Sequence, residues 1–432
     1  MGGESGAVPA AEVLAVGSEL LAGQIVNSNA AEVSAALAEA GLEVRWHTVV
    51  GDEVGEIASA VARAVGRAAV TVVCGGLGPT HDDLTREGIA QALGRPLAQD
   101  PALVGALEQR FATMGRAMSV ANLRQADLPQ GASSIPNPNG TAPGVFVEHD
   151  GHQLYALPGV PGELRAMLSS FVLPSVVAGL GAPAVVTATV RTAGIAESDL
   201  AARVAPVLER AAAEGAGRVK VAILASSGEV RLCLTAPADE ASAALVASLE
   251  SSVRALLGPL VYGGAGSSLE STVSQMLRER GMTLAVAESL TGGLLASRIV
   301  SLPGASDVLV AGYVAYSVAA KERDLGVPAA VIEEHGVVSV QTARAMAVGA
   351  RARAGASVAL STTGEAGPLP AQGGSKPAPV GSVCVGLAWE EGAGAWAVRM
   401  GGSREMIRAR TCTWALNQLR LWLLGEGPPP FG

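Results

Sequence analysis

A serine and a lysine in the C-terminal third of the chain have the residue types of a nucleophile and its base. Ser289 stands in the run Ala287-Glu288-Ser289-Leu290-Thr291-Gly292-Gly293, and Lys321 closes the run Tyr316-Ser317-Val318-Ala319-Ala320-Lys321. A serine hydroxyl is a weak nucleophile, and a lysine can activate it if burial lowers the amine pKa from its ordinary value of about 10.4. Residues 308–320 carry no charge, which favours a neutral amine. Such a pair is a recognised variant of the Ser-His-Asp triad and would attack a carbonyl carbon.

Each of these residues also has a purely structural interpretation. Ser289 precedes a helix pattern of small and apolar residues, and serines there usually cap the helix. Lys321 could begin the exposed face of a helix, Lys321-Glu322-Arg323-Asp324. His335 is the one histidine of this region and stands at an expected helix end, which makes a Ser-His-Asp triad the weaker hypothesis.

Two further segments of this region could hold an anionic substrate. Residues 361–368 follow an expected strand at 357–360 and offer small residues whose backbone N–H groups could approach an anion. Gly401-Gly402-Ser403-Arg404-Glu405 precedes the expected last helix, where Arg404 and the helix N-terminus could bind phosphate together. Each segment alone is a common turn or cap, but both in one domain favour an anion site.

Carboxylates and glycines meet at expected strand ends in the first half of the chain. Glu19 follows Gly17-Ser18, and Asp82 and Asp83 follow the glycine-rich residues 75–81. Hard oxygen ligands of this kind suit Mg²⁺ or Mn²⁺, which would bridge to a diphosphate while loop amides hold its oxygens. The alternative is that Asp83 caps a helix beginning at Leu84. Two more glycine- and proline-rich loops, residues 137–144 and 157–163, complete four such loops.

The surrounding segments predict the elements that position these loops. Strands at 13–16, 42–50 and 70–74 alternate with helices at 29–40 and 53–67, which predicts a parallel sheet whose ligand edge is at the strand C-termini. Residues 174–266 predict a small α+β domain, with strands 219–225 and 229–236 joined by Ser226-Ser227-Gly228. Residues 262–268 are an expected linker. From Leu269 strands and helices alternate again. A strand at 282–287 leads into Ser289, and the last expected helix spans 404–423.

Composition limits the classes of function. The 432 residues favour two or three domains, and 49% hydrophobic residues with 3% aromatics predict cores of Ala, Val and Leu. Acidic residues outnumber basic ones, 39 to 30, without a basic cluster, so nucleic acid is not expected as the main ligand. The four cysteines show no zinc spacing and fit buried thiols in a reducing cytosol. No signal or membrane-spanning pattern is found, and we expect a cytoplasmic protein without a membrane partner.

The order of these motifs resembles the CinA family of competence/damage-inducible proteins over nearly the whole chain. In the first half the matching segments are residues 17–29, 75–86, 139–144 and 157–159. In the second half they are Ala287-Glu288-Ser289, Ala315-Tyr316-Ser317, Lys321, Glu334-His335-Gly336, residues 363–368 and Pro379-Val380-Gly381.

The resemblance implies three domains and two activities. It implies a molybdopterin-binding-like, three-layer α/β domain at 10–173 with ADP-ribose diphosphatase activity, a small KH-like α+β domain at 174–264, and an α/β CinA C-terminal domain at 267–425 that is a nicotinamide-nucleotide amidase. The amidase converts nicotinamide mononucleotide (NMN) to nicotinic acid mononucleotide and ammonia and needs no cofactor. The diphosphatase splits ADP-ribose into AMP and ribose phosphate with a divalent metal ion, Mg, Mn or Co. Assembly as a homodimer is also implied.

The resemblance also implies residue roles. Ser289 is the expected nucleophile, Lys321 its base, and Tyr316 a positioning or proton-relay group. The expected residues of the amidase substrate site are Thr291, Gly292, Gly293, Thr363, Gly364 and Arg404, with N–H groups of residues 291–293 as oxyanion donors. The expected N-terminal nucleotide-binding residues are Gly17, Glu19, Asn27, Gly75, Gly76, Gly78, Pro79, Thr80, Asn139, Gly140, Thr141, Pro158 and Gly159. The expected metal ligands are Asp82, Asp83 and Glu19.

The chain departs from the family pattern at four places. Val318-Ala319 replaces an Asn-Glu pair, Glu365 replaces an isoleucine, and Gly402-Ser403-Arg404 replaces Gly-Asp-Arg. Residues 369–372 also interrupt the run before Gly373-Gly374. These departures keep a second hypothesis open, an interaction protein of competence and DNA repair with one or both sites vestigial. A third hypothesis, independent of them, takes the N-terminal half as a molybdopterin-handling domain.

Overall fold

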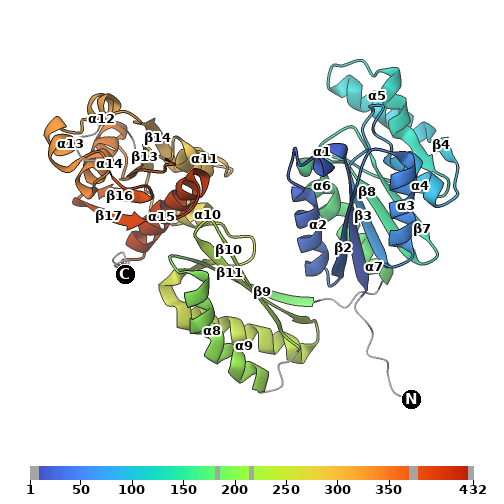
Figure 1. Ribbon diagram of the computed structural model, residues 1–432, viewed down its shortest axis with the longest axis horizontal. Coiled ribbons are helices and arrows are strands. Elements are labelled where there is room, and N and C mark those ends of the chain that lie inside the picture. Colours follow the sequence, from blue (N-terminus) through green and yellow to red (C-terminus); the bar gives the residue numbers. More distant parts are fainter. Residues whose placement is uncertain (1–8, 181–184, 214–217, 369–377, 427–432) are drawn as a thin grey trace. The chain divides into compact units, whose positions relative to one another are not determined.

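The computed structural model describes residues 9–180, 185–213, 218–368 and 378–426, which form two compact units, Met1–Val186 and Thr187–Gly432 (Figure 1). The interruption at 369–372 and the pair Gly373-Gly374 lie outside the described residues. Each unit is described separately below.

The first unit is built on a six-stranded sheet in the order β2-β1-β3-β8-β7-β6. Strands β1, β2, β3 and β8 are parallel, as the alternating pattern predicts, whereas β7 and β6 add an antiparallel edge. The strands are β1 Ala10–Val16, β2 Glu43–Val50, β3 Val70–Cys74, β6 Ser133–Ile135, β7 Gly144–His149 and β8 His152–Leu157, and a separate antiparallel pair is β4 Leu97–Gln99 with β5 Asp127–Pro129.

Helices cover both faces of this sheet and make three layers (Figure 1). One core joins the sheet to α2, α6 and α7, and a second core joins its other face to α3 and α4. Asn27 caps α2 by accepting from Ala30 N, and the two helices expected at 29–40 and 53–67 are found at Ser28–Glu39 and Val54–Val65. The helices are α1 Ser18–Leu21, α2 Ser28–Glu39, α3 Val54–Val65, α4 Thr85–Ala92, α5 Pro101–Thr113, α6 Pro161–Met167 and α7 Leu173–Leu180.

The second unit begins with a four-stranded antiparallel sheet in the order β10-β11-β9-β12, covered on one face by two helices. Its elements are β9 Val185–Ala193, α8 Glu197–Ala213, β10 Lys220–Ser226, β11 Glu229–Pro237, α9 Glu240–Leu257 and β12 Val261–Gly263. The expected hairpin is present, and Ser227 and Gly228 turn it with φ of 50° and 87°, as a two-residue turn requires. In the described part of the chain, Glu240–Leu260 is the one helical segment with the length and hydropathy of a membrane span, yet α9 packs its apolar face on β11.

The rest of the second unit is a five-stranded sheet in the order β14-β13-β15-β16-β17. Strands β14, β13 and β15 are parallel, and β16 and β17 are antiparallel. Helices α10 and α15 cover one face, and α14 covers the other. The elements are α10 Leu269–Glu279, β13 Leu284–Glu288, α11 Leu294–Val300, β14 Leu309–Val314, α12 Val318–Leu325, α13 Ala329–His335, α14 Val340–Ala354, β15 Val358–Gly364, β16 Ser382–Trp389, β17 Gly392–Arg399 and α15 Arg404–Leu423.

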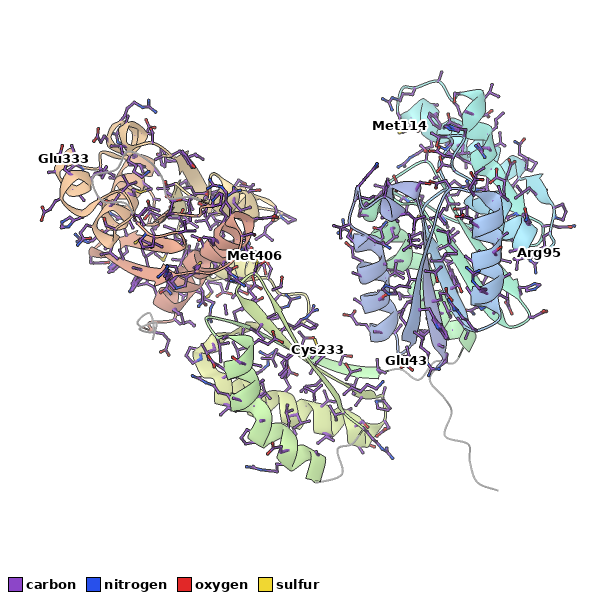
Figure 2. All side chains as sticks on the ribbon, viewed as in Figure 1. Glu43, Arg95, Met114, Cys233, Glu333 and Met406 are labelled. Carbon is purple, nitrogen blue, oxygen red and sulfur yellow. The ribbon has the colours of Figure 1, made fainter. Side chains whose placement is uncertain are left out.

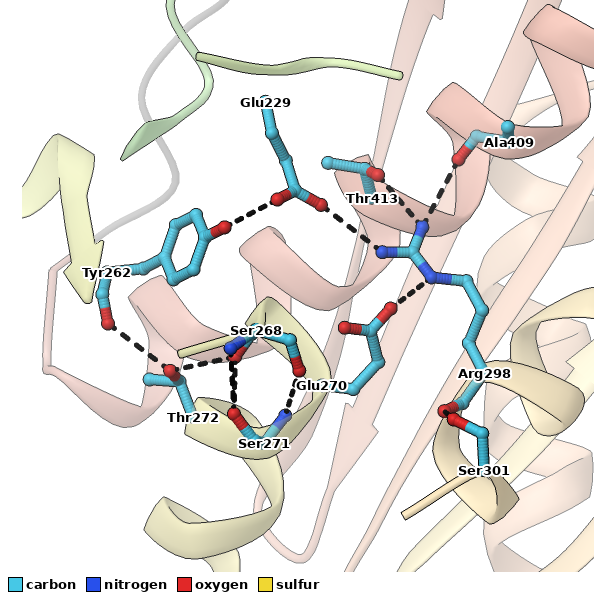
Figure 3. A network of polar contacts seen from close by, with 10 residues as sticks. All are labelled: Glu229, Tyr262, Ser268, Glu270, Ser271, Thr272, Arg298, Ser301, Ala409 and Thr413. Carbon is cyan, nitrogen blue, oxygen red and sulfur yellow. Dashed lines mark hydrogen bonds and ion pairs between the residues drawn. The ribbon is translucent and has the colours of Figure 1, made fainter. Parts of the chain in front are cut away.

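The two sheets of the second unit are joined by a polar network rather than by a free linker (Figure 3). Tyr262 lies in β12 and donates its hydroxyl to Glu229, 2.5 Å away, so the expected linker at 262–268 begins inside a strand. The second carboxylate oxygen of Glu229 accepts from Arg298 on α11 at 3.3 Å. Arg298 also contacts Glu270 and donates to Thr413 of α15 at 2.9 Å.

The four cysteines are free thiols. Cys74, Cys384 and Cys412 are buried, and Cys233, on β11, is half-buried (Figure 2). Burial raises the pKa of the Cys74 and Cys412 thiols to about 12, so both are unreactive at neutral pH. The expectation of buried thiols is confirmed for Cys74, Cys384 and Cys412, but not for Cys233.

Candidate functional site

Ser289 lies at a strand-to-helix turn. Strand β13 ends at Glu288, the Ser289 N–H donates to Thr362 O of β15 at 2.9 Å, and α11 begins at Leu294. The N-cap of α11 is Gly293, so the interpretation of Ser289 as a helix cap is wrong. The side chain is therefore free for another role.

Lys321 lies inside the first turns of α12 and points to Ser289. Ser317 caps α12 by accepting from Ala320 N, and this fixes the helix start three residues before Lys321. Lys321 is fully buried, and its Nζ lies 3.0 Å from Ser289 Oγ. Burial lowers the pKa of this amine to about 8. The interpretation of Lys321 as an exposed surface residue is wrong.

The remaining contacts of the amine orient its lone pair. Lys321 Nζ donates to the carbonyl oxygens of Ala315 at 2.8 Å and Tyr316 at 3.1 Å. A neutral amine has two N–H groups and one lone pair, so two carbonyl acceptors leave the lone pair for the third neighbour, the Ser289 hydroxyl. This is the arrangement that a general base requires.

Most N–H groups of the loop after Ser289 are already used inside the protein. The buried carboxylate of Glu288 accepts from Gly293 N and Leu295 N at 2.9 Å and from Ala296 N at 2.8 Å. Gly292 N donates to Ser289 O at 3.1 Å. The expectation that Gly292 and Gly293 are oxyanion donors is therefore wrong, because their N–H groups have internal acceptors.

Two N–H groups of this loop remain. Within the described residues, neither Leu290 N–H nor Thr291 N–H has an acceptor. The N–H of the residue directly after a nucleophile is a common oxyanion donor at strand-to-helix turns. Leu290 N–H has that position, and Thr291 N–H follows it.

The loop carbonyls are held by an arginine that sequence reasoning missed. Arg408, on α15, donates Nε to Leu290 O at 3.1 Å and Nη2 to Thr291 O at 2.7 Å. Its one signal in the sequence is its position four residues after Arg404, on the same face of a helix. Glu288 was also missed, and its signal is a carboxylate at the end of an apolar strand before a glycine pair.

Arg404 and Tyr316 meet at the edge of this site. Arg404 is the first residue of α15, whose N-cap Ser403 accepts from Met406 N. Its guanidinium donates to Gly367 O at 2.7 Å and to the Tyr316 hydroxyl at 3.2 Å. The Tyr316 side chain is 60% exposed, so these groups can meet a ligand from solvent.

Thr363 and Gly364 lie in a strand rather than in a loop. Strand β15 extends to Gly364, and its residues pair with β16. Thr363 is buried and donates its hydroxyl to Val337 O at 2.9 Å. Residues 361–364 therefore belong to strand β15 and not to the anion-binding loop that was expected at 361–368. His335 ends α13 and pairs with Glu334 at 3.6 Å, not with Ser289.

A pocket of about 510 Å³ lies at the C-terminal ends of β1, β3 and β8 in the first unit. Its lining includes most of the predicted nucleotide-binding residues: Gly17, Glu19, Asn27, Gly75, Gly76, Gly78, Pro79, Thr80, Thr141, Pro158 and Gly159. Asn139 and Gly140 do not line it, because Asn139 donates to Gly162 O and Gly140 N to Asn137. The four predicted loops thus supply one pocket.

Three carboxylates of this pocket do not form a metal cage. Glu19, Asp82 and Asp83 all line it, but in the described part of the chain no three His, Cys, Asp or Glu side chains are placed to hold one ion. The Thr80 hydroxyl lies 2.5 Å from Asp82 Oδ1 and from Asp83 Oδ2, and it lowers the pKa of Asp82. Asp83 also accepts from Thr80 N, and the N-cap of α4 is Leu84, so the Asp83 cap is wrong. Mg²⁺ often needs only one or two carboxylates beside substrate phosphates, and the exposed Asp82 fits that use.

Family models match three consecutive parts of the chain. Residues 12–178 match a probable molybdopterin binding domain, residues 187–263 the KH domain of damage-inducible protein CinA, and residues 266–423 the CinA C-terminal domain. The predicted fold class and family resemblance are confirmed by these matches.

Whole-length relatives carry the same name. A CinA-like protein of Frankia casuarinae is 46% identical over 421 residues, covering 96% of each chain, and one of Geobacter metallireducens is 40% identical, covering 96% of this chain and 99% of its own. Among solved structures, a CinA protein from Thermoplasma acidophilum is 37% identical, covers 38% of this chain and 96% of its own, and has a TM-score of 0.37.

Proposed function

The chain belongs to the CinA family, and from that premise we propose that its C-terminal domain is a serine amidase that converts NMN to nicotinic acid mononucleotide and ammonia. The contact that carries the proposal is the 3.0 Å approach of Lys321 Nζ to Ser289 Oγ, made by a buried amine whose pKa is lowered to about 8. A lysine in this state can accept a proton near neutral pH.

The reaction proceeds in two steps. Lys321 takes the Ser289 proton as Oγ attacks the carboxamide carbon, and the N–H groups of Leu290 and Thr291 bind the oxyanion. The ammonium of Lys321 then protonates the departing nitrogen, so ammonia leaves and an acyl-serine remains. Water, deprotonated by Lys321, attacks the acyl carbon. The bond between that carbon and Ser289 Oγ then breaks, Lys321 returns the proton to Oγ, and the carboxylate product leaves. Arg404 faces solvent beside Tyr316 and is suited to the substrate phosphate.

The test is ammonia release from NMN by the purified protein. We expect Ser289→Ala and Lys321→Ala each to lower kcat by about 10⁴-fold or more, because nucleophile and base act as one unit. Circular dichroism should show both variants folded. Wild-type turnover by Lys321→Ala would exclude lysine as the base. No ammonia from wild-type protein at high concentration would favour the interaction-protein hypothesis.

For the first unit we propose hydrolysis of the ADP-ribose diphosphate bond, supported by the glycine-lined pocket of about 510 Å³. Loop amides would hold the phosphate oxygens, and Asp82 would bind a divalent ion together with them. The ion, when bound, supplies Lewis-acid stabilisation of the phosphate charge.

Chelation of divalent ions should distinguish the two proposed activities. EDTA should abolish AMP formation from ADP-ribose and leave ammonia release from NMN unchanged, because the proposed amidase uses only protein groups. Asp82→Asn should lower AMP formation about 10–100-fold, since it removes a ligand. Asp150→Asn, an exposed position outside the pocket, is the matched control. AMP formation that persists in EDTA would contradict the metal role. Tight binding of molybdopterin without ADP-ribose turnover would favour the molybdopterin hypothesis.

A further inference from the structure

Arg408 reaches from α15 into the loop that follows the nucleophile. Its side chain is half-buried, and its two donated hydrogen bonds, 3.1 Å to Leu290 O and 2.7 Å to Thr291 O, end on consecutive peptide groups. Within the described residues no carboxylate forms an ion pair with it. The guanidinium therefore donates its hydrogen bonds to the backbone of this loop.

The planarity of the peptide bond turns these contacts into control of the opposite N–H groups. In a trans peptide the C=O and the next N–H point in opposite directions. Arg408 holds Leu290 C=O, so it also fixes the direction of Thr291 N–H. The preceding peptide is fixed independently, because Ser289 C=O accepts from Gly292 N and this sets Leu290 N–H.

The two N–H groups fixed in this way are the two that have no internal acceptor. Glu288 and Ser289 O take the other N–H groups of the turn, so the loop presents Leu290 N–H and Thr291 N–H alone. An oxyanion site depends on donors that are oriented before the charge develops. A guanidinium suits the task, since its fixed fork can hold two carbonyls and its charge persists at any working pH.

We propose that Arg408 is a positioning residue of the amidase: it orients Thr291 N–H toward the oxyanion from behind the peptide, without touching the substrate. The inference rests on the proposed amidase function. Removing the fork should lower kcat, whereas substrate binding in the ground state should change little, because the carbonyl of the bound amide carries no full charge.

The experiment compares Arg408→Gln, Arg408→Lys and the matched control Arg410→Gln in the full-length protein. Arg410 lies on the same helix but donates to Gly401 O, away from the loop. We expect kcat to fall about 10–100-fold in Arg408→Gln, less in Arg408→Lys, and not in Arg410→Gln. KM for NMN should stay within threefold. The pH midpoint set by Lys321 should not move.

The outcomes separate this inference from the proposed function. Absence of ammonia release by wild-type protein overturns the amidase function and this inference with it. An active wild type with an Arg408→Gln kcat within twofold overturns only the role of Arg408. A KM for NMN raised by as much as kcat falls, or unfolding of both Arg408 variants, makes Arg408 a residue that maintains structure and also overturns the inference.

Discussion

At the scale of single residues, the chemistry depends on the protonation state of Lys321. The amine is fully buried among Ser289 Oγ and two backbone carbonyls, and its pKa falls to about 8 through loss of hydration. Val318 and Ala319, the nearby departures from the family pattern, are exposed on the outer side of α12. They therefore do not alter the surroundings of the amine.

The pH dependence of the amidase follows from this pKa. The base must be neutral, so activity is lost as pH falls below about 8 and is complete above it. At pH 7 about a tenth of the enzyme is active, and kcat/KM should rise about tenfold from pH 6 to pH 7. A pH–rate profile from 6 to 10, with folding checked at each pH, measures this. A flat profile, or a midpoint near 10.4, would exclude the buried neutral amine.

The pairing of Ser289 with Lys321 could be anticipated only in part from the sequence. The uncharged residues 308–320 indicate burial of Lys321, but Ser and Lys in isolation look like a cap and a surface residue. Their meeting depends on β13 and β14 lying side by side, which is a long-range property. Arg408 had almost no local signal, because an arginine within a helix is usually solvated.

At the scale of elements, the turn from β13 to α11 is organised by Glu288. Its buried carboxylate accepts three N–H groups at the start of α11, where a helix otherwise has unsatisfied donors. A negative charge there is also favoured by the helix dipole. The helix N-terminus is thus occupied by the protein itself, which is why the proposed oxyanion donors are N–H groups of the residues before it.

Removing this carboxylate should destabilise the element and the site together. Glu288→Ala leaves one buried and two partly buried N–H groups without acceptors, and we expect the free energy of unfolding to fall by about 3 kcal/mol. Urea denaturation followed by circular dichroism measures the change. Glu333→Ala, an exposed position on α13, is the control and should stay within about 0.5 kcal/mol. A loss below about 1 kcal/mol for Glu288→Ala would contradict the capping role.

Element boundaries show where local patterns stop being informative. The last helix is found at its predicted bounds. A long segment without Gly or Pro, preceded by a glycine pair and Ser403, is a strong signal for a helix and its start. Strand β15 instead runs past its expected end to Gly364, since the partner strand β16 supplies hydrogen bonds to residues that look like a loop. The pairing partner, not the local sequence, decides that boundary.

At the scale of the whole molecule, the smaller sheet of the second unit is linked by polar contacts to α11, the helix that follows Ser289. Arg298 lies on α11, one helix turn after the groups that Glu288 holds, and contacts both Glu229 of β11 and Glu270 of α10. The side chains are mostly buried, with exposures of 19%, 22% and 12%. One arginine therefore balances two carboxylates from different parts of the unit.

Substitution of Arg298 should lower the free energy of unfolding more than substitution of Glu229. Arg298→Gln leaves Glu229 and Glu270 without the cation that they share, and we expect it to lower the free energy of unfolding of the second unit by about 2–4 kcal/mol. Glu229→Gln should cost only about 1 kcal/mol or less, since Arg298 keeps Glu270 and the amide still accepts from Tyr262.

Urea titrations at pH 7.5 measure both costs, with ADP-ribose turnover as the readout that the first unit is unaffected. Equal costs for Arg298→Gln and Glu229→Gln at pH 7.5 would mean that the network does not work as a shared cation, and that apolar packing alone holds α11 against the smaller sheet.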